Sequence, residues 1–354
     1  MASWLRAGVR DLDPGCFALV MATGIVAAAM RLGGQRHLAG LLLGASVAGY
    51  LVLAAAYAAR LAWFRRELAA DMGDPRRAFG FFTVVAASDV ISAGLAGDGH
   101  VTAAAVLLAV AGASWVLLSC SVPLLLAGRP SLAGANGTWF LWVVGAESVA
   151  VAAVSLRRPA PAALAALAIC CWAVGVVLYL IVAGLVAVAL MSVPVRPAEV
   201  TPPYWVFMGA TAITVLAGGL LLGTPAGRLG GAVRGALAGL SVILWAFGTW
   251  LVPLLVVTGI WRHLVRGVSL RYEPGMWSIV FPVGMYGVGS RALGDAAGVS
   301  WMVTLGRYEA WLALAAWAVV ALAMAASLAR AAACPSGRGP GTMAPGDRSS
   351  SSPR

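Results

Sequence analysis

The sequence predicts an all-α integral membrane protein whose ten transmembrane helices form five helical hairpins. Composition is the first observation behind this prediction: of 354 residues, 61% are hydrophobic and only 10% are charged, whereas an average soluble domain carries about 25% charged residues. Long apolar runs are the second observation, and a repeated pattern at the start of alternate runs is the third. A chain with so little polar surface cannot cover itself in water, so we expect it to lie in a lipid bilayer.

Apolar runs long enough to cross a bilayer recur along the chain. About 20 predominantly apolar residues suffice for one transmembrane helix. We expect ten such helices, at residues 14–30, 38–59, 78–97, 101–126, 136–156, 160–193, 203–223, 235–261, 275–293 and 309–329. Residues 1–330 then form one transmembrane domain. Residues 331–354 are rich in Ser, Pro, Gly and Arg and are expected to form a disordered tail.

The arginines predict the orientation of these helices, because cytoplasmic loops carry an excess of positive residues. All 24 basic residues are arginines, and sixteen of them fall on the side of the two termini. The other side holds eight, namely Arg31, Arg36, Arg157, Arg158, Arg228, Arg234, Arg291 and Arg307. This split predicts a multi-pass protein of the plasma (cell) membrane with both termini in the cytoplasm. The net charge of +11 does not indicate nucleic-acid binding, because no basic stripe or zinc-ligand spacing accompanies it.

The odd-numbered predicted helices all open with a helix breaker followed closely by an aromatic residue. The five openings are DPGCF (13–17), AFGFF (78–82), NGTWF (136–140), PPYWVF (202–207) and EPGMW (273–277). The breakers recur at steps of 57 to 72 residues, which is one helical hairpin per repeat. Internal repeats of this kind are common in membrane transport proteins. The pattern therefore predicts five hairpins with quasi-five-fold symmetry.

Polar residues within the predicted helices also favour the odd-numbered ones. Small and weakly polar residues allow close packing or face water, whereas aliphatic helices suit lipid. The odd helices hold Thr23, Gly24, Ser88, Asp89, Ser92, Glu147, Ser148, Thr211, Thr214, Ser278, Gly284 and Gly287, while the even helices are largely Leu, Val and Ala. We therefore expect an inner ring of odd helices around a central pore, surrounded by the even helices.

Five sequence blocks resemble the tellurite-resistance/dicarboxylate transporter family, which includes plant slow-type anion channels, fungal malate permeases and sulfite efflux pumps. The blocks are PGCFALVMATGIV, NGTWFLWVV, YWVFMGATAI, GTWLVPLLVVTGIWRH and WSIVFPVGMY, and the resemblance runs from about residue 13 to residue 330. It implies a homotrimer in which each ten-helix subunit has its own pore for small inorganic or carboxylate anions. It also implies a phenylalanine on the ninth helix that plugs the pore, which corresponds to Phe281.

The stretch WSIVFPVGM supports Phe281 as a pore gate on chemical grounds as well. Phe281 is an isolated ring among Ser, Val, Pro and Gly residues, between Trp277 and Tyr286. A bulky ring on a helix facing an axial passage would narrow it and exclude water, as hydrophobic constrictions do in gated pores. Pro282 removes a backbone hydrogen bond and bends the helix at that level. The alternative is that Phe281 packs as an ordinary core residue.

Two carboxylates, Glu147 and Asp89, lie within predicted membrane helices. Such a residue costs roughly 2.5–3.5 kcal/mol on insertion scales and marks a functional position by default. A protonated Glu147 could donate a hydrogen bond to an anion or relay a proton, whereas an ionised Glu147 would repel anions. The alternative for both residues is a hydrogen bond to a neighbouring helix, and for Asp89 this alternative is favoured.

The remaining candidates for a pore or substrate site are weakly polar residues of the odd helices and one arginine. The first group consists of Thr23, Ser148, Thr211, Ser278 and Gly284. Arg291 is the only arginine within a predicted odd helix, so it could attract anions. Its alternative is an interfacial arginine whose charged end reaches towards the membrane surface.

The leading functional hypothesis is an anion channel or carrier, and two alternatives stay open. Within transport, the alternative is a proton-coupled exporter of C4-dicarboxylates, sulfite or tellurite. The rival class is a membrane-embedded enzyme, which should show clustered His, Cys, Asp or Glu near one membrane face. His37, His100 and His263 all fall in predicted loops. We therefore expect no catalytic residues, no cofactor and no metal site.

Overall fold

The computed structural model describes residues 3–127, 134–157, 159–192, 196–225 and 229–333. Within these ranges the chain is helical and contains no strand. The α-helices are α1 (Ser3–Arg10), α2 (Ala18–Leu32), α3 (Arg36–Trp63), α4 (Arg65–Met72), α5 (Thr83–Gly97), α6 (Val101–Ala127), α7 (Leu141–Leu156), α8 (Ala162–Ser192), α9 (Val206–Leu222), α10 (Gly231–Ile260), α11 (Trp277–Ala297) and α12 (Ser300–Ala333). The tail that we expected to be disordered lies outside the described residues from residue 334 onward.

Eight helical segments of the described chain are long and apolar enough to cross a membrane. They contain α3, α5, α6, α7, α8, α9, α10 and α12. Helix α2 is apolar but has only 15 residues, and α11, with Arg291 and Asp295 near its end, does not meet the same criterion. The predicted all-α membrane class is thus confirmed, while ten membrane crossings stay a prediction.

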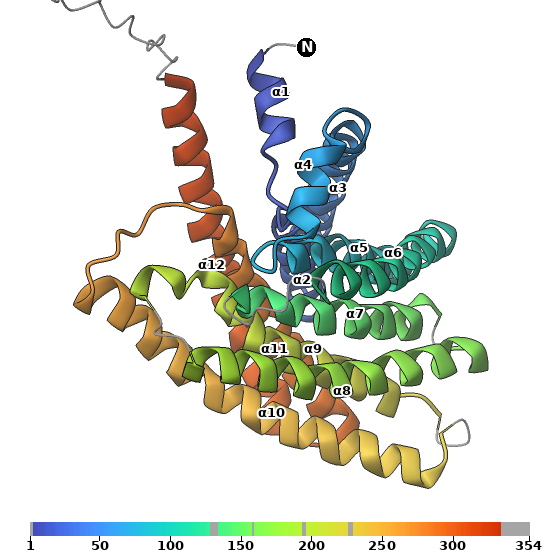
Figure 1. The fold of residues 1–354 in the computed structure, drawn as a ribbon. Helices are drawn as coiled ribbons and strands as arrows, with labels where there is room; N and C mark the ends of the chain where they lie inside the picture. Colours follow the sequence, from blue (N-terminus) through green and yellow to red (C-terminus); the bar gives the residue numbers. More distant parts are fainter. Residues whose placement is uncertain (1–2, 128–133, 158, 193–195, 226–228, 334–354) are drawn as a thin grey trace, which may run out of the picture.

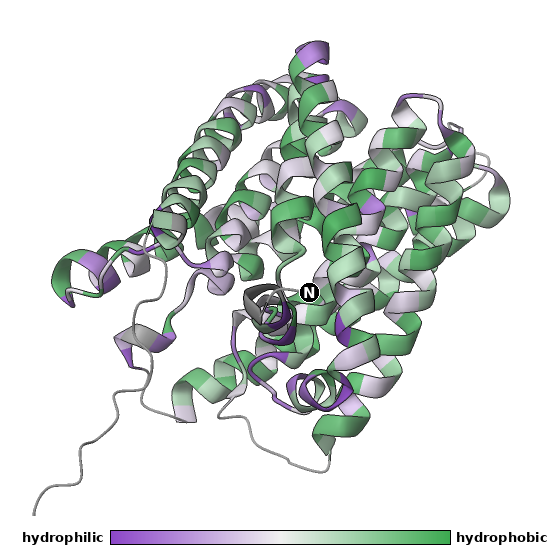
Figure 2. Cartoon of the chain, turned by 90° about the horizontal axis from the view of Figure 1, so that it is seen from above, coloured by the Kyte–Doolittle hydropathy of each residue, from purple (hydrophilic) through white to green (hydrophobic). Residues whose placement is uncertain are grey.

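The helices pack as an inner group of five covered by an outer group of five. Helices α2, α5, α7, α9 and α11 contact one another in a closed cycle, and each also packs on the long helix that follows it in the chain (Figure 1). The two groups differ in burial: 72–83% of the most apolar stretch is buried in α5, α7 and α9, against 11–28% in the outer helices. Apolar residues run along the helices, and hydrophilic residues gather at ends and connections (Figure 2).

Each inner helix begins with a tight turn at the breaker residues found in the sequence. Four of these turns are 3₁₀ helices: η1 (Ala78–Phe82), η3 (Gly137–Phe140), η5 (Pro202–Trp205) and η8 (Pro274–Met276). Before α2, the amide of Ala18 donates to the carbonyl of Gly15 at 2.9 Å, which is the same three-residue hydrogen-bond spacing. Glycine lets neighbouring turns touch, since a Cβ at Gly80 would lie 3.0 Å from the backbone nitrogen of Gly15.

A buried ion cluster ties the N-terminal segment to the ring. Arg60 of α3 is 2% exposed and donates from Nη2 to Asp71 of α4 at 2.6 Å. Its Nε donates to the carbonyl of Arg10 at the end of α1. Asp71 also pairs with Arg77, 3.1 Å away, just before the opening turn of α5. The pairs hold α1, α3 and α4 against this turn, because a buried charge is stable only when it is paired.

The last predicted helix is longer than its sequence pattern indicates. We expected residues 309–329, but α12 begins at Ser300 and extends through Ala333. Arg307 and Glu309 lower the hydropathy of its first turns, although charged residues do not interrupt a helix. The hydropathy pattern therefore located the apolar part of α12 and missed both ends.

Candidate functional site

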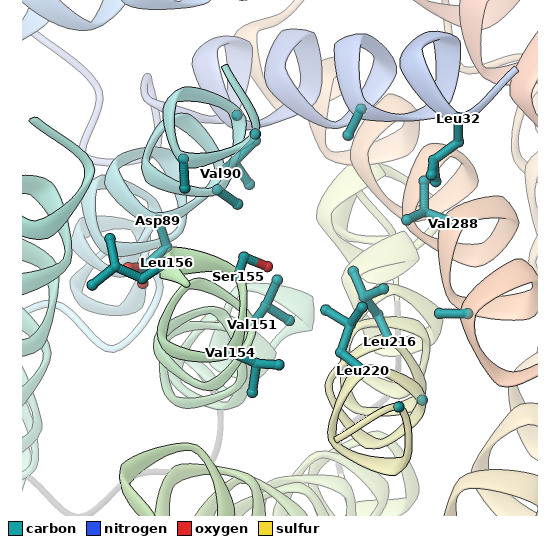
Figure 3. Close-up of a pocket in the computed structure, with 18 of the residues that line it drawn as sticks. Leu32, Asp89, Val90, Val151, Val154, Ser155, Leu156, Leu216, Leu220 and Val288 are labelled. Atoms are coloured by element: carbon teal, nitrogen blue, oxygen red, sulfur yellow. The ribbon is translucent and has the colours of Figure 1, made fainter. Parts of the chain in front are cut away.

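Two cavities lie at opposite ends of the inner ring. The small cavity, of about 480 Å³, is lined by the opening turns of the five inner helices, including Gly15, Gly80, Thr138, Pro203 and Ser278. The wide cavity, of about 1240 Å³, is lined by their C-terminal halves. In Figure 3, Leu32, Val90, Val151, Leu216 and Val288 reach into it from α2, α5, α7, α9 and α11 in turn.

Phe281 separates the two cavities along one face of α11. Ser278 lines the small cavity, while Met285 and Val288 line the wide cavity. Positions 278, 281, 285 and 288 follow the three- and four-residue steps that keep side chains on one helix face. Phe281 is fully buried, with 0% of its surface exposed. Its ring therefore lies between the two cavities on the axis-facing side of α11.

The neighbouring helices complete an apolar layer at the level of Phe281. On each of the other inner helices, one residue lies three or four positions before the first residue that lines the wide cavity, on the same helix face. These residues, at the level of Phe281, are Met21, Ala86, Val144 and Ala210. All four are fully buried. No polar side chain belongs to this layer, and an apolar constriction of this kind excludes water and ions.

Asp89 and Ser148 lie on the wall of the wide cavity, just beyond this layer. Asp89 is 1% exposed, and the hydroxyl of Ser148 lies 2.8 Å from its Oδ2. Among the described residues, Oδ1 of Asp89 has no hydrogen-bond partner. Figure 3 shows Asp89 at the edge of the same space. The wall of the cavity thus holds a buried carboxyl whose second oxygen has no hydrogen-bond partner among the described residues.

Other sequence candidates face the outer helices and line neither cavity. Glu147 points to α8, where a Cβ at Gly175 would clash with its carboxylate. Thr23 accepts a hydrogen bond from Nε1 of Trp317 on α12, at 3.0 Å. The same holds for Thr211, whose hydroxyl faces Gly248 of α10, and for Gly284, which lies near Ala313 of α12. The structure therefore brings Asp89, Ser148, Ser278 and Arg291 to the cavities, while these four candidates lie between the two helix layers.

Three arginines surround the mouth of the wide cavity. Arg31 forms a two-pronged salt bridge with Asp98, and its guanidinium holds the pKa of that carboxyl below the usual range. Arg291 donates to the carbonyl of Leu32 at 2.6 Å. Arg157 is exposed and forms no salt bridge with any described residue. Our sequence interpretation missed Arg31 and Arg157, although each ends an inner helix, where a positive charge offsets the negative end of the helix dipole.

The small cavity is lined by groups of both charges. The N-termini of five inner helices surround it, and each presents the positive end of a helix dipole. Arg76 and Arg77 line its wall, together with Asp13, Glu199 and Glu273. Helix N-termini are common binding sites for anions. Both ends of the ring therefore carry groups that attract anions.

The histidines differ from their predicted positions. His37 lies in the first turn of α3, and His263 lies in the π-helical segment η7 (Trp261–Val265), while only His100 is in a loop. A loop preference was expected from flanking polar residues, but helices extend past the apolar core into such flanks. Within the described ranges, no three His, Cys, Asp or Glu side chains are grouped in a way that could hold a metal ion.

Comparison with known proteins gives one family match and two similar proteins. The sequence model of the voltage-dependent anion channel family (SLAC1) matches residues 11–325. A protein of Mycobacterium tuberculosis (strain CDC 1551 / Oshkosh), described as an uncharacterized membrane protein, is 50% identical over 152 residues, which are 43% of this chain and 77% of that protein. Its counterpart in strain ATCC 25618 / H37Rv matches with the same identity and coverage.

Proposed function

Because this chain belongs to the voltage-dependent anion channel family, we propose that it moves small anions across a membrane along the axis of its inner ring. The resemblance to the tellurite-resistance/dicarboxylate transporter family, read from five sequence blocks, is confirmed by that membership. Members of this family are anion channels and permeases, which places the activity in transport.

The single observation that supports an axial route is the position of Phe281. One face of α11 passes from the small cavity at Ser278 to the wide cavity at Met285, and Phe281 lies between them with no exposed surface. We propose that its ring is the gate and that the bend at Pro282 holds it over the axis. The positive N-terminal ends of the inner helices, with Arg76 and Arg77, would attract anions to the small cavity. The three arginines at the mouth of the wide cavity would attract anions there.

The test is anion flux into proteoliposomes. Purified protein is reconstituted, and influx of chloride, nitrate, sulfite and a C4-dicarboxylate is measured for wild type and Phe281→Ala. We expect flux above that of empty vesicles for at least one anion and a higher flux in Phe281→Ala. If neither protein carries any of these anions, the proposed function is wrong.

A carrier remains the second candidate, because the wide cavity has room for more than a halide. Its volume of about 1240 Å³ exceeds the range in which drug-sized ligands bind. A proton-coupled exporter of C4-dicarboxylates, sulfite or tellurite would accumulate its substrate against a gradient when a pH gradient is imposed. A channel would only equilibrate it. Uphill accumulation in the same vesicles would therefore favour the carrier.

We propose that all ten inner and outer helices cross the membrane, with both termini in the cytoplasm. Helix α2 gains length from the turn before it, and α11 has 21 residues, or about 31 Å at 1.5 Å per residue. Helix α1 and the end of α12 project from the same side of the bundle (Figure 1), which an even number of crossings requires. Reporters inserted at Gly73 and at Gly99 should give opposite signals, and equal signals would contradict this topology.

We also propose a homotrimer in the plasma membrane. The outer helices expose rows of large apolar side chains, among them Leu41 and Leu51 of α3 and Leu117 and Leu124 of α6. Such surfaces must be covered by lipid or by a second copy of the chain. Cross-linking in native membranes would separate monomer from trimer.

A further inference from the structure

We infer that Asp89 and Ser148 form a proton-binding site in the anion pathway, and that anions pass readily only when Asp89 carries its proton. The inference rests on the proposed function and goes beyond it, since the gate at Phe281 does not involve these residues. It assigns to Asp89 the role that the sequence had suggested for Glu147.

The first support is the position of Asp89 relative to the gate. It comes from α5, three residues beyond Ala86 of the apolar layer, and it lines the wide cavity. An anion that passes Phe281 therefore meets this carboxyl first. Asp295, the other acid that lines the wide cavity, lies near the mouth beside Arg291, 3.8 Å from its Nε.

The second support is the hydrogen bonding of the carboxyl. Oδ2 accepts from Ser148, whereas Oδ1 is buried without a partner among the described residues. A proton on Oδ1 would give the cavity one hydrogen-bond donor at this depth. The carbonyl of Gly145 lies 2.9 Å from the hydroxyl of Ser148 and competes with Asp89 for its single proton.

The third support is the absence of a compensating cation. No described residue forms a salt bridge with Asp89. The helices packed around α5 and α7 are α2, α3, α6, α8 and α9. Their titratable or charged side chains are Arg31, Arg36, His37, Tyr50, Tyr57, Arg60, Cys120, Cys170, Cys171 and Tyr179, while α7 itself carries Glu147 and ends at Arg157. Tyr50 is engaged with Ser88 at 2.8 Å, Cys120 is exposed, and Glu147 faces α8. Arg31 and Arg157 are at the mouth, two turns further along their helices.

These contacts define two states of the pathway. With the proton on Oδ1, the carboxyl is neutral and donates a hydrogen bond to the passing anion. Without it, a buried negative charge lies beside the anion, and like charges repel more strongly when they are removed from bulk water. Loss of the proton thus closes the route by repulsion, with no movement of a helix required.

The experiment uses reconstituted full-length protein and chloride or nitrate, whose charges do not change between about pH 5 and about pH 8. We expect wild-type flux to rise by about tenfold or more as the pH falls over this range, from the Coulomb repulsion of one nearby charge. Asp89→Asn is neutral at every pH and keeps a donor, so its flux at the high pH should equal that of wild type at the low pH. Glu147→Gln is the matched control and should keep the full pH response.

A second variant keeps the inference testable if Asp89→Asn fails to fold. Ser148→Ala removes the donor that favours the ionised carboxyl, so the midpoint of the acid activation should move to higher pH. An unchanged pH response in both Asp89→Asn and Ser148→Ala would overturn the inference, as would its loss in Glu147→Gln. A wild-type flux that does not depend on pH would also overturn the inference, while leaving the proposed function intact. The proposed function fails only if wild type and Phe281→Ala carry no anion at either pH.

Discussion

Pro282 of α11 packs directly on Gly209 of α9, so closely that a Cβ at Gly209 would lie 2.8 Å from the proline Cγ. Pro282 lies inside α11, and proline cannot donate a hydrogen bond to the carbonyl four residues earlier, which favours a bend at this position. Pro282 is adjacent to Phe281, and α9 has a glycine, with no side chain, at the point of contact. The absence of a side chain at Gly209 therefore allows α11 to approach α9 closely at the level of Phe281.

We expect Gly209→Ala to change both stability and flux. The added methyl must displace Pro282 or α9, and overpacking of this kind costs about 1–3 kcal/mol. Moving Pro282 shifts the adjacent ring of Phe281, so the flux per folded protein should differ from wild type. Thermal unfolding in detergent and vesicle flux would measure the two effects.

Gly184→Ala is the matched control for that variant. Gly184 lies in α8, and a Cβ there would meet no atom within 4 Å. The substitution should leave flux unchanged and add up to about 1 kcal/mol of helix stability. Equal behaviour of the two alanine variants would mean that the contact between Pro282 and Gly209 does not position the gate.

The contact between Glu147 and Gly175 predicts a coupled pair. A Cβ at Gly175 would clash with the carboxylate of Glu147, so Gly175→Ala should destabilise the protein by about 1–3 kcal/mol. In a Glu147→Ala background the clash is gone, and the same change should cost much less. A double-mutant cycle of unfolding midpoints measures this coupling. Additive effects would show that Glu147 does not occupy the space beside Gly175 in the membrane.

The exposed charge of Arg157 should raise the rate at which anions enter the wide cavity. Unlike Arg31, it has no acidic partner among the described residues. Arg157→Gln should lower flux by about two- to fivefold at low ionic strength, because charged walls concentrate ions of opposite sign. The difference should shrink in about 1 M salt, where the Debye length is only about 3 Å.

Arg36→Gln provides the comparison for Arg157→Gln. Arg36 begins α3 and is exposed, yet it is not among the residues that line either cavity. Removing its charge should change flux little. A similar loss in both variants would attribute the effect to net charge rather than to the mouth of the cavity.

The positions of the helices could be predicted from the sequence because the bilayer imposes a length and a hydropathy on each segment. The ends were harder to predict where a helix extends past the apolar region, as α12 does at Ser300 and Ala333. The openings of the inner helices were identified from their Pro and Gly residues, and the structure forms tight turns there. Features that depend on the local backbone preferences of Pro and Gly could therefore be predicted from the sequence.

The direction in which each side chain of an inner helix points could not be predicted from the sequence in the same way. An inner helix is covered on all sides, so its sequence shows little contrast between faces and its rotation stays open. Asp89 and Glu147 illustrate this: both are buried acids on inner helices, yet one lines the wide cavity and the other faces Gly175. Their partners distinguish them, since Asp89 contacts Ser148 of α7 and Glu147 contacts Gly175 of α8.

Phe281 provides the final prediction, which compares two equally buried phenylalanines. Phe281 of α11 and Phe140 of η3 are both 0% exposed, but Phe140 stacks on Phe207 with ring centroids 4.6 Å apart, whereas Phe281 lies between residues of α11 that line the two cavities. Truncating a packed phenylalanine to alanine costs about 3–5 kcal/mol. Phe140→Ala should therefore lose stability without gaining flux.

Truncation of Phe281 should have the opposite effect on stability and flux, because Phe281 lies on the face of α11 between Ser278, which lines the small cavity, and Met285, which lines the wide cavity. Phe281→Ala joins the two cavities and should raise flux severalfold while destabilising the fold less than Phe140→Ala does. Phe281→Leu should give an intermediate increase, since a smaller apolar side chain still excludes part of the water from the constriction. Flux is normalised to folded, inserted protein and compared across wild type, Leu and Ala. Flux that stays level or falls along this series, with the protein intact, would place the gate at another residue of the apolar layer.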